Sequence, residues 1–156
     1  MDVISAPTGV WELVFRLTLA TLLGGAVGFN REMWLKPAGL RTHALVALGA
    51  ALLTYTGLLL THTPADLDPA SRVIQGIVAG MGFIGGGVIL HRQDARVVHG
   101  LTTAASIWVV AAAGIAVGVG LWRAAIVAVT LALLVLTLGR RLDRVIHHGN
   151  DIVDDD

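Results

Sequence analysis

The sequence contains no cysteine and few charged residues, and each absence excludes a class of chemistry. Without a thiol, cysteine redox chemistry and thiolate metal sites are excluded. Only 14% of the 156 residues are charged, whereas soluble domains carry about 25%. Hydrophobic residues make up 55%, the mean hydropathy is +0.77, and many of the 19 glycines lie inside the apolar runs. Small residues in apolar runs let membrane helices pack closely, so the composition predicts an integral membrane protein.

Five apolar segments approach or reach the length of about 20 residues that a spanning helix needs. They lie at 10–29, 43–60, 73–90, 101–119 and 121–138. The last two form either a tight hairpin, which their combined length favours, or one merged or re-entrant element. The first ten residues hold no Lys or Arg, which a cleaved signal peptide requires, so we expect the first segment to remain as an anchor. The predicted fold class is an all-α membrane protein, with a bundle of five transmembrane helices in residues 1–140 and a short polar cytoplasmic tail at 141–156.

Basic residues gather in alternate loops. The second loop instead carries Asp66 and Asp68. By the positive-inside rule the odd loops and the C-terminus are cytoplasmic, and the N-terminus lies outside. The basic residues of the first loop, the third loop and the tail are Arg31, Lys36 and Arg41, then Arg92 and Arg96, then Arg140, Arg141 and Arg144.

An internal repeat links the two halves of the chain. Residues 24–51 align without gaps with residues 85–112, with ten identities in 28 positions, where about three are expected by chance. Each copy runs from a glycine-rich helix end through a basic loop to Gly-Leu-x-Thr. This order predicts a parallel repeat, in which the first two helices match the third and fourth about an axis along the membrane normal.

The cytoplasmic loops provide a candidate anion site. We expect Pro37 and Gly39 to shape the first loop and Thr42 to cap the next helix. The second and fourth helices would start side by side at the cytoplasm, where their N–H groups and positive dipole ends attract anions. Alternatively, the arginines only set the topology and meet anionic lipid heads. The candidate residues are Arg31, Arg41, Thr42, Arg92, Thr102 and Thr103, with Arg96 and Ser106 beside them.

Glycines of the third segment predict close helix packing, at the centre of the bundle or of a dimer. Alternatively, 85–87 breaks the helix and exposes carbonyls to an ion. Gly114 and Gly118 repeat the packing pattern in the fourth segment. The packing glycines of the third segment are Gly76, Gly80, Gly82 and Gly86.

Glu12 and Arg16 are the only charges inside the first span, four residues apart, which favours a helical ion pair. Both could also extend outward to water. The middles of the other spans hold no Asp, Glu or Lys, so a proton pump or a carboxylate cage for Mg²⁺ is poorly supported. The six histidines lack metal-site spacing, and no nucleophile–base pair or nucleic-acid patch is present. We expect no enzyme activity, cofactor, metal or nucleic-acid partner.

Four motifs together resemble the N-terminal membrane domain of the MgtC/SapB family. They lie at 24–32, 36–43, 75–87 and 100–108, and the resemblance covers about 11–138. It implies a multi-pass bacterial inner-membrane protein linked to survival at low Mg²⁺. The best-known members look like regulators that bind other membrane proteins, including the ATP synthase. Because the sequence stops soon after the fifth segment, we expect no soluble C-terminal domain, and the chain resembles the shorter members. Asn30 stands where many relatives have Glu, which weakens a role for a carboxylate there.

Two functions remain open from the sequence. The first is a regulator of magnesium or phosphate homeostasis that binds other membrane proteins. The alternative is a small homodimeric ion or anion transporter or channel. In either case we expect a homo-oligomer, with a dimer favoured, because five short helices with small-residue faces leave packing surface unused.

Overall fold

The computed structural model describes residues 9–60, 68–90 and 99–150, and within them the chain forms five α-helices. All five are long and apolar enough to cross a membrane, which confirms the all-α class and the five predicted spans. The helices are α1 (Val10–Glu32), α2 (Leu40–Leu59), α3 (Asp68–Leu90), α4 (Leu101–Gly118) and α5 (Trp122–Asn150).

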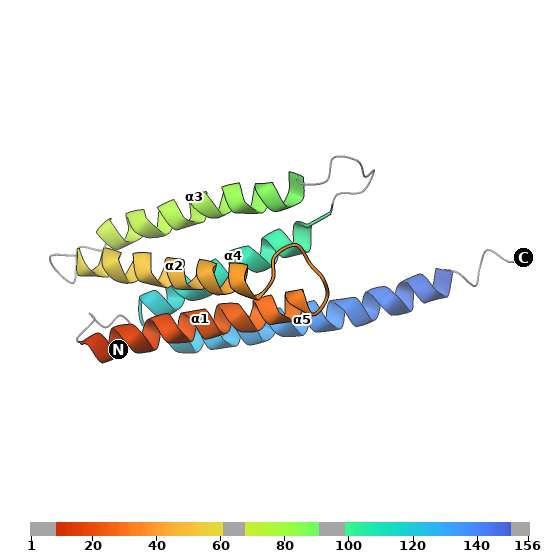
Figure 1. Ribbon diagram of the computed structural model, residues 1–156, viewed down its shortest axis with the longest axis horizontal. Helices are drawn as coiled ribbons and strands as arrows, with labels where there is room; N and C mark the ends of the chain where they lie inside the picture. The colour runs from red at the N-terminus through yellow and green to blue at the C-terminus, as the bar shows by residue number, and fades with distance from the viewer. Residues whose placement is uncertain (1–8, 61–67, 91–98, 151–156) are drawn as a thin grey trace, which may run out of the picture.

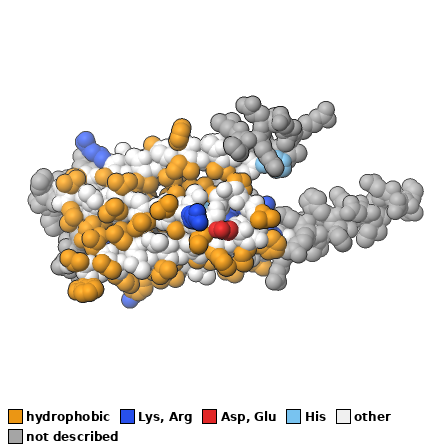
Figure 2. Space-filling view, in the orientation of Figure 1, with side chains coloured by type: hydrophobic (Ala, Val, Ile, Leu, Met, Phe, Trp, Pro, Cys, Tyr) orange, Lys and Arg blue, Asp and Glu red, His pale blue; other side chains and the backbone are white. Residues whose placement is uncertain are grey.

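The helices lie side by side in an elongated bundle, with α3 at one edge and α1 and α5 at the other (Figure 1). Helix α4 contacts all four other helices, whereas the described parts of α3 and α5 make no contact with each other. Hydrophobic side chains are spread along the visible face, and charged side chains are few, among them a basic and an acidic one next to each other (Figure 2). This distribution is typical of a protein whose sides face lipid.

Helix boundaries differ from the predicted spans in physically interpretable ways. A tight turn separates α4 from α5: Leu121 N–H donates to Ala116 O at 2.7 Å, and Gly120, with φ of 94°, donates to Val117 O at 3.0 Å. These are the two bonds of a Schellman motif, so the hairpin prediction is confirmed over the merged helix.

Helix α3 continues through 85–87, so the alternative of a helix break there is wrong. Helix α5 continues to Asn150, into the segment predicted as a tail, because 141–148 contains no glycine or proline to end it.

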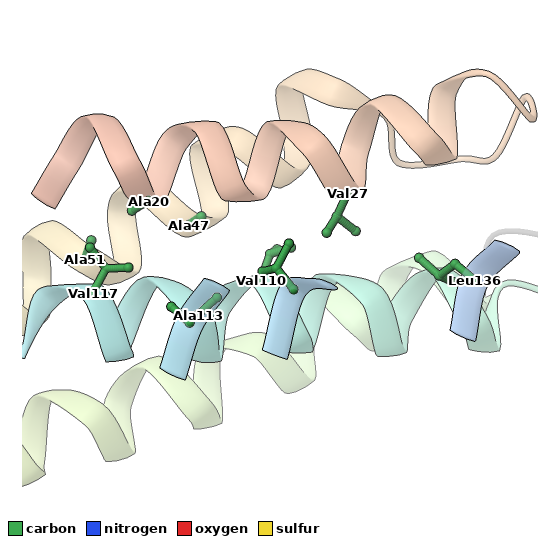
Figure 3. Packing of buried hydrophobic residues seen from close by; sticks show 10 residues of the cluster. Ala20, Val27, Ala47, Ala51, Val110, Ala113, Val117 and Leu136 are labelled. Atoms are coloured by element: carbon green, nitrogen blue, oxygen red, sulfur yellow. The ribbon is translucent and has the colours of Figure 1, made fainter. Parts of the chain in front are cut away.

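The core is built from small residues, which lets the helix backbones approach closely. Ala20, Ala47, Val110 and Val117 are each no more than 1% exposed and meet between α1, α2 and α4, as Figure 3 shows. Because alanine and valine fill little space, the helices pack at short separation.

Glycines of α1 and α4 make the closest approaches, both to α2. A Cβ added at Gly24 would lie 2.5 Å from His43 O, and one at Gly114 would lie 2.4 Å from Ala47 O. Gly118 is similarly close to α2, at 2.8 Å from Ala51 O. The structure therefore places Gly114 and Gly118 at a helix contact, as the sequence predicted.

The glycines of α3 behave differently from those of α1 and α4. A Cβ added at any of four of them would meet no other atom of the described residues within 4 Å. They therefore do not mediate packing at the centre of this bundle, because α3 is its outermost helix. Packing at a dimer contact stays a prediction for these residues, Gly76, Gly80, Gly82 and Gly86.

Candidate functional site

The loop between α1 and α2 folds back over the end of α1. Lys36 N–H donates to Arg31 O at 3.2 Å, and Leu35 adopts a left-handed φ of 51°. The backbone N–H of Leu40 donates to the Glu32 carboxylate at 2.8 Å. An anionic side chain of the chain itself thus occupies the positive N-terminus of α2.

Helix α2 begins at Leu40 with Gly39 as its N-cap, so the prediction that Thr42 caps this helix is wrong. Glycine has no side chain to satisfy the first N–H groups, and Glu32 supplies the acceptor from the preceding helix. The expected pair of open helix N-termini is therefore reduced to that of α4.

The N-terminus of α4 is formed by a glycine that approaches α3 closely. Gly100 has φ of 91°, and a Cβ there would lie 2.7 Å from Val88 O. The first helical bond of α4 joins Ala104 N–H to Gly100 O at 2.9 Å. The helix itself therefore leaves the N–H groups of 101–103 for other acceptors.

A cavity of about 980 Å³ lies between this helix start, the α1–α2 loop and the neighbouring parts of α1, α3 and α5. We name it the basic pocket. No Asp or Glu is among its described lining residues. Its apolar lining includes Val88, Ile89, Val135 and Leu136. Its basic and polar lining residues are Arg31, Lys36, His99, Thr102, Thr103 and Arg140.

Two arginines give the basic pocket uncompensated positive charge. Arg31 is 2% exposed; its Nη2 donates to Thr103 Oγ1 at 2.6 Å, but its buried Nε has no hydrogen-bond partner in the described part of the chain. Both Nη atoms of Arg140 are buried and lack a partner there too. The guanidinium carbon of Arg140 lies 4.7 Å from the centre of the Trp34 ring. The two arginine charges also repel each other. Buried cations of this kind are costly without an anion beside them.

Below the pocket, a fully buried histidine connects the loop to α4. His43 Nδ1 lies 3.0 Å from Gly39 O, and its Nε2 lies 3.0 Å from Ser106 Oγ. Ser106 Oγ in turn donates to Thr103 O at 2.8 Å. Because a carbonyl only accepts, His43 Nδ1 carries a proton. This network holds Thr103, the partner of Arg31, in place.

The structure brings together only some of the predicted anion-site residues. Arg31, Thr102 and Thr103 line the basic pocket, whereas Arg41 is exposed and Thr42 lies within the first turn of α2, and neither lines it. Arg92 and Arg96 lie outside the described residues. Asn30 is buried and does not line the pocket either.

Sequence reasoning missed Arg140 as a site residue and used it only for topology. Arg140 is 109 positions from Arg31, and only the packing of α5 brings it to this end of the bundle. Its place at the end of the last apolar span was a signal that it lies at the same membrane boundary as the α1–α2 loop.

A second polar cluster lies far along α1 from the basic pocket. Arg16 forms an ion pair with Glu12, as their spacing predicted. Arg16 is only 2% exposed, however, and its Nη1 donates to Gly118 O at 2.6 Å. Outward extension of Arg16 is therefore wrong, because the C-terminal carbonyls of α4 attract its charge inward. Tyr55 lies below the guanidinium, 5.9 Å from ring centre to carbon. This cluster holds α1, α2 and α4 together.

The described residues contain no group of three or more His, Asp or Glu side chains placed to hold a metal ion. The expectation that the chain lacks a metal site stays a prediction for the chain as a whole.

Sequence comparisons with known proteins identify relatives of this chain. A sequence model of the MgtC family matches residues 17–145. The chain is 42% identical to the protein SrpB of Synechococcus elongatus, over 93% of this chain and 85% of SrpB. It is 44% identical to YhiD of Escherichia coli, named as a candidate magnesium transporter, over 84% of this chain and 62% of YhiD. It is 42% identical to the protein MgtC of Brucella abortus, over 81% of this chain and 51% of MgtC.

The chain therefore spans between half and two thirds of the length of YhiD and MgtC. No solved structure matches it.

Proposed function

Because this chain belongs to the MgtC family, as its glycine-rich motifs indicated, we propose that it is a non-enzymatic regulatory membrane protein in magnesium and phosphate homeostasis. Its regulatory input is an anion of the phosphate type, bound in the basic pocket. The observation that carries the proposal is a set of buried guanidinium nitrogens without a hydrogen-bond partner in the described part of the chain, namely Nε of Arg31 and both Nη atoms of Arg140. They lie at a cavity with no described acidic lining residue.

The chemistry of the pocket suits a phosphate group. A planar guanidinium binds phosphate through two parallel N–H bonds, and Arg140 offers both of its Nη groups. The N-terminus of α4 adds backbone N–H groups and a partial positive charge on the same cavity. An acidic side chain of a partner membrane protein would be bound by the same groups.

Magnesium enters this proposal through the anion. Mg²⁺ prefers oxygen ligands and binds many sites through phosphate groups, whereas the described lining of the basic pocket is cationic. Free Mg²⁺ therefore competes with the pocket for phosphate-type anions, and the pocket fills when Mg²⁺ is scarce. The name of YhiD, a candidate magnesium transporter, agrees with a link to magnesium.

The direct test measures thermal unfolding of purified protein with pyrophosphate. At about one hundred times its dissociation constant, a ligand adds about 2.7 kcal/mol of stability, which raises the melting temperature. We expect Arg140→Gln to lose this rise and added Mg²⁺ to reduce it. Arg41→Gln is the matched control, because Arg41 is exposed and does not line the pocket. The anion site would be overturned if pyrophosphate did not raise the melting temperature of the wild-type protein, or if both variants lost the rise equally.

Orientation in the bilayer follows from the loop charges. We propose that the N-terminus lies outside the bacterial inner membrane and that the basic pocket faces the cytoplasm, because Lys and Arg concentrate in the odd loops. The parallel repeat is part of the same proposal, since an offset that keeps the topology places the starts of α2 and α4 on the same side.

A dimer through α3 is also part of the proposal. Gly76 and Gly80 lie four residues apart on an exposed face of α3, and a Cβ added at either would meet no atom of the part of the chain that the structure describes within 4 Å. Such small-residue pairs let two membrane helices approach closely. Gly80→Cys should therefore cross-link two copies in native membranes, whereas Leu45→Cys, exposed on α2, should not. The reverse pattern would place the dimer contact elsewhere.

Transport of the bound anion is the second candidate function, favoured by a sizeable cavity open at one end of a membrane bundle. Against it, Val27, Ala47 and Val110 are fully buried and close the bundle interior. Phosphate and Mg²⁺ flux into proteoliposomes decides between the two. Saturable flux lost in Arg140→Gln would replace the regulator with a transporter, and no flux from folded protein would leave the regulator.

A further inference from the structure

The basic pocket is larger than a small inorganic anion needs. Its volume of about 980 Å³ lies at the top of the roughly 300–1,000 Å³ range of sites that enclose drug-sized ligands. The charged groups occupy only part of this space. Its remaining lining is mostly aliphatic and glycine, so a free anion would leave most of the cavity unfilled.

The lining changes from basic to apolar along the helices. On α5, Arg140 is followed inward by Leu136 and Val135, and five residues of helix correspond to about 7.5 Å. On α3, the lining residues Gly87 and Val88 lie in the last turns of its apolar span. On α5, the apolar lining of the pocket therefore lies deeper in the membrane-spanning region than Arg140.

This apolar part opens sideways. The described parts of α3 and α5 both line the pocket. They make no contact with each other, and Figure 1 shows them at opposite edges of the bundle. One glycine of each helix lines the pocket, Gly87 on α3 and Gly139 on α5, and a Cβ at either would meet no atom of the described ranges within 4 Å. Val135 is 71% exposed although it lines the pocket, so the cavity is continuous with the surface that faces lipid chains.

We infer that the basic pocket, which is the anion site of the proposed function, binds an anionic phospholipid. Arg31 and Arg140 hold its phosphate, and an acyl chain leaves the pocket between α3 and α5 over Val135. Phosphate in water and phosphate in a lipid head share the same chemistry at the arginines. Only the lipid also fills the apolar side of the cavity, where each buried methylene adds affinity.

The test compares ligands on delipidated full-length protein in detergent, by native mass spectrometry and thermal unfolding. The ligands are phosphatidylglycerol, zwitterionic phosphatidylcholine, soluble glycerol phosphate and pyrophosphate. We expect phosphatidylglycerol to bind at least about tenfold more tightly than glycerol phosphate and than phosphatidylcholine. Arg140→Gln should weaken phosphatidylglycerol binding by roughly tenfold, because charge-assisted hydrogen bonds are lost.

Two variants separate this inference from the anion site itself. Gly139→Leu and Gly87→Leu fill the side opening and keep both arginine side chains. Each should weaken phosphatidylglycerol binding by a larger factor than pyrophosphate binding. Gly49→Leu on α2 is the control, since its Cβ also meets nothing and Gly49 does not line the pocket.

The outcomes distinguish the two claims. If pyrophosphate stabilises the protein but phosphatidylglycerol binds no more tightly than glycerol phosphate, the lipid inference is overturned and the proposed function stands. Phosphatidylglycerol binding that survives both glycine variants places the lipid elsewhere and also overturns it. Stabilisation by neither ligand overturns both.

Discussion

Single residues decide how closely these helices approach. Gly114 is the sharpest case, because its added Cβ would lie 2.4 Å from Ala47 O, a backbone atom that cannot rotate away. Gly114→Ala should therefore force α2 and α4 apart and destabilise the fold by about 1–3 kcal/mol. Unfolding by SDS titration in mixed micelles measures this loss.

Gly80→Ala provides the comparison on α3. Among the described residues, a Cβ at Gly80 meets no atom within 4 Å, and alanine favours a helix over glycine by about 1 kcal/mol. We expect its folding stability to be unchanged or slightly raised. Equal destabilisation by both substitutions would contradict the assignment of close packing to α4 and not to α3.

The sequence carried only part of the information about these residues. The spacing of Glu12 and Arg16 predicted their ion pair, because that contact is local. The inward direction of Arg16 depends on Gly118 of another helix, and the close approach of Gly24 depends on His43. Contacts of that kind follow from tertiary packing, which single-residue patterns do not contain.

At the scale of helices, the hydrophobic runs predicted every span, but the caps set the ends. Helix α2 begins at Leu40 and not at the predicted position 43, because Glu32 of the preceding helix accepts a hydrogen bond from the Leu40 N–H. The end of α4 could be predicted, because the glycines at Gly118 and Gly120 that form it are visible in the sequence. Local turn chemistry could therefore be predicted, whereas a cap supplied across a loop could not.

Glu32→Ala tests this cap. Without the carboxylate, the first N–H groups of α2 lose an acceptor, and the loss of an N-cap costs about 0.5–2 kcal/mol. Hydrogen–deuterium exchange should become faster in 40–43 and stay unchanged in 101–104, at the start of α4. Unchanged exchange in 40–43 would mean that Glu32 does not stabilise this helix start.

At the scale of the whole molecule, the candidate site is an assembly of distant segments. The sequence predicted that Arg31 and Thr103 would meet near the start of α4, because the repeat placed two helix starts side by side. It did not predict the contribution of α5, since Arg140 joins the basic pocket only through the packing of α5 against α4 and α1. It also did not predict that α3 lies at the edge, because its composition is as apolar as that of the central helices.

The orientation of the whole bundle is the remaining prediction, and the absence of cysteine makes it directly testable. Pro37→Cys in the exposed α1–α2 loop and Leu121→Cys in the α4–α5 turn each introduce one thiol at opposite ends of the bundle. In intact cells, a membrane-impermeant maleimide should label Cys at 121 and leave Cys at 37 unlabelled until the membrane is opened. This pattern follows from the Lys and Arg of the first and third loops, which resist translocation. The opposite labelling pattern would place the basic pocket outside the cell, where a cytoplasmic phosphate signal could not reach it.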